Sequence, residues 1–194
     1  MTTLNQKIAA LSAESRERVL RGSEALIAAE AANRNGLLNL RDGAYQQAVA
    51  DFSEALDLDP GNVSAYNNRG IAYARRFDYT RAIADFNVAL AIDPELFECL
   101  VNRGLAHDER SDYVLAVADF NNALRLRPEF PTAYHARGLT YSHTGDDEKA
   151  ASDFDRAMRL SPAPTPSRND GRSAYLPMGE AELDVADHRQ HIQT

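Results

Sequence analysis

The chain has 194 residues, of which 44% are hydrophobic and 26% charged, proportions that suit a globular protein with a continuous core. Its net charge is -8 and its Lys and Arg residues form no cluster, which argues against sequence-independent binding of nucleic acid, because phosphate contacts need a basic face. We expect no membrane span, because no apolar run of about 18 residues occurs.

The first expected element is an extra or capping helix within residues 1–28. Gly22 followed by Ser23 predicts that this helix stops and that a new one begins with Ser23 as its N-cap. Such a helix can cap the unit that follows or form a dimer contact, and the sequence leaves both open. Its apolar residues fall at helical spacing: Leu4, Ile8, Leu11 and Val19.

The chain carries one cysteine, Cys99, and its first residues are polar, without the apolar stretch of an export signal. A single cysteine allows no intramolecular disulfide, which favours a reducing compartment. We therefore expect a cytoplasmic protein in which Cys99 is a small buried side chain.

From residue 29 the sequence repeats every 34 residues, four times, without an insertion or deletion. Each unit holds two segments of helical period, and in the second unit these run over 63–76 and 80–92, with Pro94 at the junction to the next unit. Turn-forming residues join the two segments near positions 43, 77, 111 and 145. The residues that recur are Gly36, Gly70, Gly104 and Gly138; Ala48, Ala82, Ala116 and Ala150; Phe52, Phe86, Phe120 and Phe154; Ala55, Ala89, Ala123 and Ala157; and Pro60, Pro94, Pro128 and Pro162.

These spacings resemble the tetratricopeptide repeat family, although the usual aromatic positions hold Ala32, Asn39 and His107. The resemblance implies an all-α fold, a right-handed superhelical solenoid of antiparallel helix pairs. The implied repeats are 29–62, 63–96, 97–130 and 131–164, followed by a linker and a weak C-terminal helix in 165–194. The second repeat carries the resemblance most fully, with Tyr66, Gly70, Tyr73, Ala82, Phe86, Ala89 and Pro94.

Two expectations concern packing. A helix-interior glycine costs about 1 kcal/mol relative to alanine, so we expect close packing to compensate, with Gly70 facing Ala82 and Phe86 filling the space between repeats.

Recurring Asp and Arg residues predict ion pairs between neighbouring repeats; the alternative is an exposed pair of little energetic value. The pairs expected are Asp51 with Arg69, Asp85 with Arg103, and Asp119 with Arg137.

The family resemblance implies a peptide-binding groove on the concave face, lined by the first helix of each repeat. Its charge is uneven, because arginines occupy the first two repeats and acidic residues the third, so a peptide with complementary charge order is implied. Asn68 and Asn102 resemble the groove asparagines that hydrogen-bond a ligand's backbone in the family; solvated asparagines of a helix face are the alternative. The implied groove residues are Glu30, Asn33, Arg34, Leu37, Arg41, Asn67, Asn68, Ile71, Arg75, Glu98, Val101, Asn102, Leu105, Glu109, His135, Leu139 and His143.

One branch of the family clamps the acidic tails of chaperones with cationic side chains. In this chain the corresponding positions hold Glu98 and Asn102, or Thr132 and Ala136 if the register shifts by one repeat. We therefore expect no clamp for a chaperone tail.

We find no constellation for catalysis and no phosphate-binding loop, and we expect neither an enzyme nor a cofactor. His188 and His191 have a spacing that can place two zinc ligands on one helix face, but no third ligand accompanies them, so we expect no metal site.

The function that follows is a non-catalytic adaptor or scaffold that binds a peptide segment of another protein. The alternatives are a cytosolic chaperone of the secretion type and a regulatory or accessory subunit of an enzyme complex. A homodimer through the N-terminal helix or the uncapped C-terminal end stays possible. The segment 178–190 has three open arrangements: it caps the last repeat, enters the groove or docks on a partner.

Overall fold

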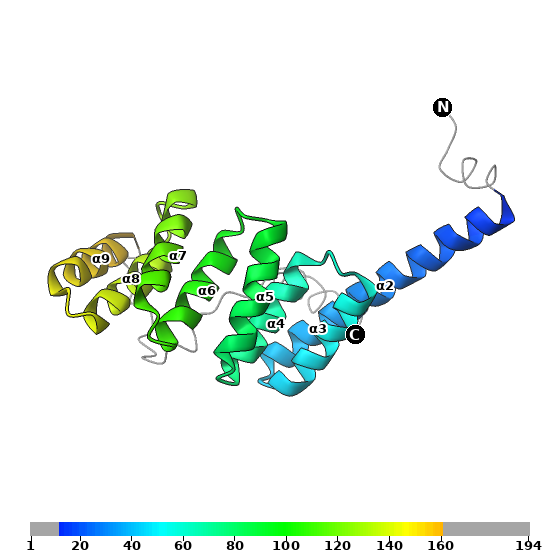
Figure 1. The fold of residues 1–194 in the computed structure, drawn as a ribbon, viewed down its shortest axis with the longest axis horizontal. Helices are drawn as coiled ribbons and strands as arrows, with labels where there is room; N and C mark the ends of the chain where they lie inside the picture. Colours follow the sequence, from blue (N-terminus) through cyan, green and yellow to red (C-terminus); the bar gives the residue numbers. More distant parts are fainter. Residues whose placement is uncertain (1–11, 161–194) are drawn as a thin grey trace, which may run out of the picture.

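The computed structural model describes residues 12–160, and these residues form eight α-helices and no strand. Figure 1 shows the helices as a row of antiparallel pairs that follow the chain from one end of the molecule to the other. No helix in this described part has the length and apolar character that a membrane crossing requires. The helices are α2 (Ala13–Arg41), α3 (Tyr45–Leu58), α4 (Val63–Arg75), α5 (Tyr79–Ile92), α6 (Phe97–Glu109), α7 (Tyr113–Leu126), α8 (Pro131–His143) and α9 (Asp147–Leu160).

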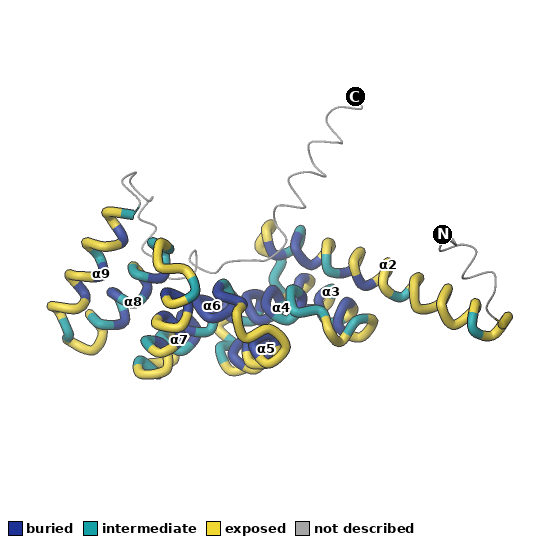
Figure 2. The backbone as a smooth tube through the Cα atoms, turned by 90° about the horizontal axis from the view of Figure 1, so that it is seen from above, coloured by how far each residue is buried: buried dark blue, intermediate teal, exposed yellow. Residues whose placement is uncertain are grey.

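The two helices of each predicted repeat pack most extensively against each other, and the second helix of each repeat then packs against the first helix of the next. Helices α4 and α5 begin and end within one residue of the predicted segments 63–76 and 80–92. The buried residues run as a continuous band between the two rows of helices (Figure 2). The all-α stacked architecture expected from the 34-residue period is thus confirmed.

The recurring glycines make room for the recurring phenylalanines. A Cβ atom added to Gly70 would lie 2.6 Å from Cε1 of Phe86, and the same contact recurs between Gly36 and Phe52. Phe52 and Phe86 are completely buried. We expected Gly70 to face Ala82, but the three atoms nearest to an added Cβ all belong to Phe86, so the small residue of the first helix accepts an aromatic ring of its own repeat.

The turns between paired helices use a left-handed residue at the four predicted positions. Gly43 and Gly145 have φ values of 78° and 77°, while Phe77 and Ser111 adopt 62° and 64°. Glycine takes this conformation without steric cost, whereas a residue with a Cβ is strained there. Two of the four repeats thus accept a strained turn to keep the helix pair closed.

Helix α2 runs without interruption from Ala13 to Arg41, and Ser12 caps its start by accepting a hydrogen bond from the backbone N–H of Ser15 at 3.2 Å. The predicted break at Gly22 and Ser23 is wrong. The hydroxyl of Ser23 donates to the carbonyl of Val19 at 3.0 Å instead of capping a new helix, and one interior glycine costs too little to end a long helix. Figures 1 and 2 show the N-terminal part of α2 projecting beyond the packed pairs.

At the opposite end, α9 exposes part of its stacking face, as expected of a last repeat without a cap directly after it. Met158 is 64% exposed, whereas the equivalent Leu56, Leu90 and Leu124 of the earlier repeats are buried. The segments 1–11 and 165–194, including the helix expected at 178–190, lie outside the described residues.

Candidate binding groove

The first helices of the repeats form the inner row of the solenoid. Helix α2 contacts α4, α4 contacts α6, and α6 contacts α8, so successive first helices approach each other more closely than successive second helices do. The row with the shorter spacing lies on the inside of a curved stack. The helices that carry the predicted groove residues, α2, α4, α6 and α8, are therefore neighbours on the inner side of the stack.

Burial divides the predicted groove residues into a floor and a rim. The floor residues are buried: Leu37, Asn67, Asn68, Ile71, Val101, Asn102 and Leu105. Another group is half-buried and lies between floor and rim: Asn33, Arg75, Glu98 and Leu139. The rim residues are exposed: Glu30, Arg34, Arg41, Glu109, His135 and His143.

The floor contains three asparagines that are fully buried and linked to each other. Asn102 on α6 donates from Nδ2 to Oδ1 of Asn67 on α4 at 2.9 Å, and Asn67 donates to Oδ1 of Asn68 at 3.3 Å. Buried amides are costly unless they are hydrogen-bonded, so this row connects two repeats while keeping polar atoms at the floor. The alternative of solvated asparagines at Asn68 and Asn102 is thereby excluded.

Asn33, on the neighbouring helix α2, differs from these three amides. Its Oδ1 atom is buried, and no donor among the described residues hydrogen-bonds to it. A buried acceptor without a donor costs about 1 to 3 kcal/mol. An N–H group of a bound segment, or a water molecule, would remove this cost.

The rim charges are held by contacts between repeats. Nδ1 of His143 on α8 lies 3.2 Å from a carboxylate oxygen of Asp108 on α6, and the ring of Tyr113 lies 5.7 Å from the His143 ring, centroid to centroid. The hydroxyl of Tyr79 donates to Glu109 at 3.2 Å. Sequence reasoning assigned His143 and Glu109 to the groove, but it found neither contact.

The Arg and Asp ladder holds each helix pair together, and the expected pairing between repeats is wrong. Arg103 donates to Asp119 of its own repeat through Nε at 2.8 Å and Nη2 at 2.6 Å, and it reaches the preceding repeat only through Asn87, at 2.8 Å. The reason is the glycine contact: Gly104 packs against Phe120, which brings Arg103 to the adjacent Asp119. The same pairs are Arg69 with Asp85 and Arg137 with Asp153.

In the first repeat, which has no Arg at this position, Asn39 donates to Asp51 at 2.6 Å. In the others the hydrogen bonds to Asp raise the pKa of the arginines above the ordinary value, as in Arg103 with Asp119. The guanidinium groups of the ladder therefore stay charged and are engaged within the helix pairs.

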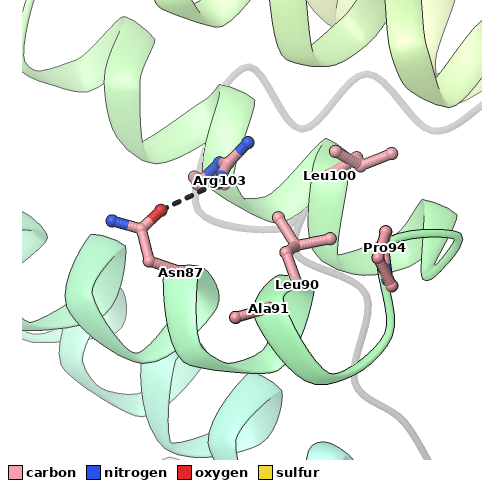
Figure 3. A pocket seen from close by; sticks show the side chains of 6 residues that line it. All are labelled: Asn87, Leu90, Ala91, Pro94, Leu100 and Arg103. Atoms are coloured by element: carbon pink, nitrogen blue, oxygen red, sulfur yellow. Dashed lines mark hydrogen bonds between the residues drawn. The ribbon is translucent and has the colours of Figure 1, made fainter.

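A small pocket of about 270 Å³ lies between α5 and α6, and none of the floor residues lines it (Figure 3). Arg103 and Asn87, which are hydrogen-bonded to each other, form its polar side, and the remaining lining residues are Leu90, Ala91, Pro94 and Leu100. Its volume lies below the usual range of small-molecule sites, about 300 to 1,000 Å³. Sequence reasoning did not find it, and its polar residues already serve the junction between two repeats.

Cys99 is completely buried and donates to the carbonyl of Phe86 at 3.6 Å, as the expectation of a buried structural cysteine requires. Burial raises the pKa of its thiol above the ordinary value. Within residues 12–160 no group of three His, Cys, Asp or Glu side chains is placed to hold a metal ion. His188 and His191 lie outside the described residues.

Comparison with solved structures places the fold among helical repeat proteins. MamA residues 41 to the end from Desulfovibrio magneticus RS-1 match with a TM-score of 0.65 and 23% identity, covering 71% of this chain and 77% of that one. The tetratricopeptide domain of Arabidopsis OM64 matches with a TM-score of 0.60 and 28% identity over 61% and 98% of the two chains. The first tetratricopeptide domain of Spaghetti (RPAP3), bound to the HSP90 peptide SRMEEVD, matches with 0.54 and 22% over 67% and 95%.

A search of curated proteins gave no significant match. The family model described as a tetratricopeptide repeat matches residues 9–63, 33–96 and 101–163, which is most of the chain. The recurring residues, the stacked helix pairs and this match agree, and the chain belongs to the tetratricopeptide repeat family.

Proposed function

We propose that this protein is a non-catalytic adaptor that binds an extended segment of another protein along the groove formed by α2, α4, α6 and α8. The observation that carries the proposal is Oδ1 of Asn33, a buried acceptor in the groove without a donor among the described residues. A peptide backbone presents N–H groups at regular intervals, so an extended segment supplies a donor of the required kind.

The rim adds selectivity through charge. Arg34 and Arg41 are exposed on α2, whereas Glu109 is exposed on α6 with Asp108 beside it. A segment with acidic residues toward the first repeat and basic residues toward the third complements this order, and complementary charges select orientation and raise the association rate.

We expect a different class of ligand from that of the similar Spaghetti (RPAP3) domain. That domain is bound to an HSP90 peptide, SRMEEVD, whose C-terminal part is acidic. Glu98 stands where the family's clamp uses a cation, and Asn102 is buried in the floor. An acidic chain terminus at the third repeat would therefore meet a like charge. The secretion-type chaperone and the accessory subunit stay alternatives that the identity of the partner decides.

The first test changes Asn33 to leucine, which is of similar size and has no polar atoms. We expect the protein to unfold at the same or a higher denaturant concentration, because the unpaired acceptor is gone, and to bind its partner at least about tenfold more weakly. Loss of stability with unchanged binding would contradict the proposal. Asn122→Leu, on the exposed face of α7, is the matched control and should leave binding unchanged.

The partner can be identified by photocrosslinking. A photoreactive amino acid at Arg34 or His135 lies on the rim, whereas the same amino acid at Glu54 or Asn122 lies on the outer helices α3 and α7. We expect one protein to be captured from the two rim positions and not from the outer positions, with the crosslinked peptide read by mass spectrometry. Capture from Glu54 and Asn122 alone would place the binding surface on the outer face and refute the groove.

A further inference from the structure

The arm, which we define as residues 12–30 of α2, has two faces with different chemistry. One face carries only charged and small side chains: Glu14, Glu17, Arg18, Arg21, Glu24, Ala25 and Ala28. The other carries the large apolar residues of the arm, Val19, Leu20, Leu26 and Ile27, which are 41%, 58%, 54% and 67% exposed. Spacings of three, four and seven residues place the members of each set on one side of the helix.

We propose that the apolar face of the arm binds the same face of a second copy of this chain in an antiparallel, two-fold symmetric pair centred on Ser23. The proposal does not depend on the identity of the groove ligand, although the face ends at Glu30, which also lies on the rim of the groove, so the dimer and a groove ligand meet at the first repeat. It concerns a surface that the solenoid leaves uncovered, as the projecting part of α2 in Figure 1 shows.

The order of residues on this face reads the same from either side of Ser23. Leu20 and Leu26 lie three residues before and after it, and Val19 and Ile27 lie four residues before and after it. In an antiparallel pair with its two-fold axis at Ser23, each of these residues meets its counterpart in the partner subunit. A two-fold interface must be self-complementary in this sense, and an interface with an unrelated protein need not be.

The charges at the ends of the face follow the same rule. Arg16 and Glu30 lie seven residues before and after Ser23, on the same side as the apolar residues. Both are exposed, and neither forms an ion pair within residues 12–160. The antiparallel arrangement places Arg16 opposite Glu30 of the partner subunit, and symmetry produces this pair twice. A parallel arrangement would place like charges together at both ends.

The centre of the face permits close approach of the two helices. Ser23, which lies at the proposed two-fold axis, has a small side chain. The Ser23 hydroxyl already donates to the carbonyl of Val19, so its donor is satisfied when the surface is covered. Contact between backbones is thus possible at the axis without burying an unpaired hydrogen-bond donor.

The interface is short, so the dimer is expected to be weak, with a dissociation constant in the range of about 1 to 100 µM. Sedimentation equilibrium of the full chain over a range of concentrations measures it. Replacing Leu26 and Ile27 together by serine should weaken the dimer by at least about tenfold. The control Val114→Ser removes an apolar side chain that is 85% exposed on α7 and should leave the dimer unchanged.

A charge swap tests the register. Arg16→Glu alone and Glu30→Arg alone should each weaken the dimer by about three- to tenfold, since each creates two like-charge contacts. The two substitutions together swap the charges of the pair and should restore the wild-type dissociation constant to within about threefold. Failure of the double variant to recover would overturn the antiparallel register.

Crosslinking tests the axis. Because the single cysteine, Cys99, is completely buried, a cysteine introduced at Ser23 is the reactive thiol of the native chain. With a short bismaleimide, Ser23→Cys should give covalent dimers much faster than Glu24→Cys on the charged face. A chain that stays monomeric up to several hundred micromolar would overturn the proposal, and so would equal crosslinking of the two cysteine variants. It would also be overturned if the wild-type chain has the mass of a monomer and the serine variant at Leu26 and Ile27 loses the binding of a different protein.

Discussion

Replacing Gly70 by alanine separates helix propensity from packing, because the two make opposite predictions. Alanine is favoured over glycine in a helix interior by about 1 kcal/mol, so propensity alone predicts a more stable protein. The structure predicts the reverse. The new Cβ would lie 2.6, 2.9 and 3.0 Å from three ring atoms of Phe86, a side chain that is completely buried and cannot move into solvent.

Overpacking a buried site costs about 1 to 3 kcal/mol. Since three atoms of one rigid ring are involved, we take the upper part of this range, and subtracting the propensity gain leaves a net loss of about 1 to 2 kcal/mol. Gly22→Ala is the matched control: it lies in a helix with no atom within 4 Å of the added Cβ, so only the propensity gain applies.

Cys99 gives a local assay for this prediction. Its thiol donates to the carbonyl of Phe86 and is buried, so it reacts with a thiol reagent only when the junction between α5 and α6 opens. Gly70→Ala should raise the labelling rate by about five- to thirtyfold and lower the urea midpoint, while Gly22→Ala changes neither in that direction. In a Phe86→Leu background the Gly70→Ala effect should shrink. A Gly70→Ala protein as stable as the wild type would refute the contact.

Three further predictions concern other features. A double-mutant cycle should give a coupling of about 1 to 3 kcal/mol between Arg103 and Asp119, because their double hydrogen bond is largely buried, and almost none between Arg103 and Asp85. Ser111→Gly should raise the free energy of unfolding by about 1 kcal/mol by relieving the left-handed turn, and no change in thermal midpoint would contradict the strain. Burial lowers the pKa of His107, so the folded state favours the neutral ring. The contribution of this ring to the free energy of unfolding is full above about pH 6.5 and declines as the pH falls toward the pKa of the folded state. Urea titrations at several pH values should show a smaller decline for His107→Tyr than for the wild type.

Sequence reasoning located the helix pairs because a 34-residue period and its turn residues are local properties of the chain. It placed turns near positions 77 and 111, and the structure adds that Phe77 and Ser111 are left-handed there. Sequence reasoning failed where a predicted contact depended on how one helix is rotated about its axis relative to the helix beside it. Whether Gly70 meets Ala82 or Phe86 depends on which sides of two helices face each other, and spacing alone does not fix this.

The same limit explains the ion pairs and the groove. Once Gly104 is placed against Phe120, Arg103 lies next to Asp119 of its own repeat, whereas the recurrence of Asp and Arg along the sequence does not show which helices the pairs join. For the predicted groove, the family resemblance indicated first helices that contact one another in the structure, but it could not separate buried from exposed residues. Asn68 and Asn102, the predicted ligand-binding amides, are fully buried, and Asn33 carries a buried acceptor that has no donor among residues 12–160.

Repetition also raises a question of register for any ligand of this groove. Four repeats with equivalent backbones would let an extended segment shift by one repeat at little cost if their inner surfaces were equal. They are not equal: one position of the first helix is arginine in the first two repeats, Glu109 in the third and His143 in the fourth. If the segment shifts by one repeat, an acidic residue that faced an arginine would face Glu109 instead, and the attraction would be replaced by repulsion between like charges. The non-repeating residues of the rim are thus the ones that can fix both direction and register, whereas the glycines, phenylalanines and arginines of the ladder are engaged between helices and hold the surface in place.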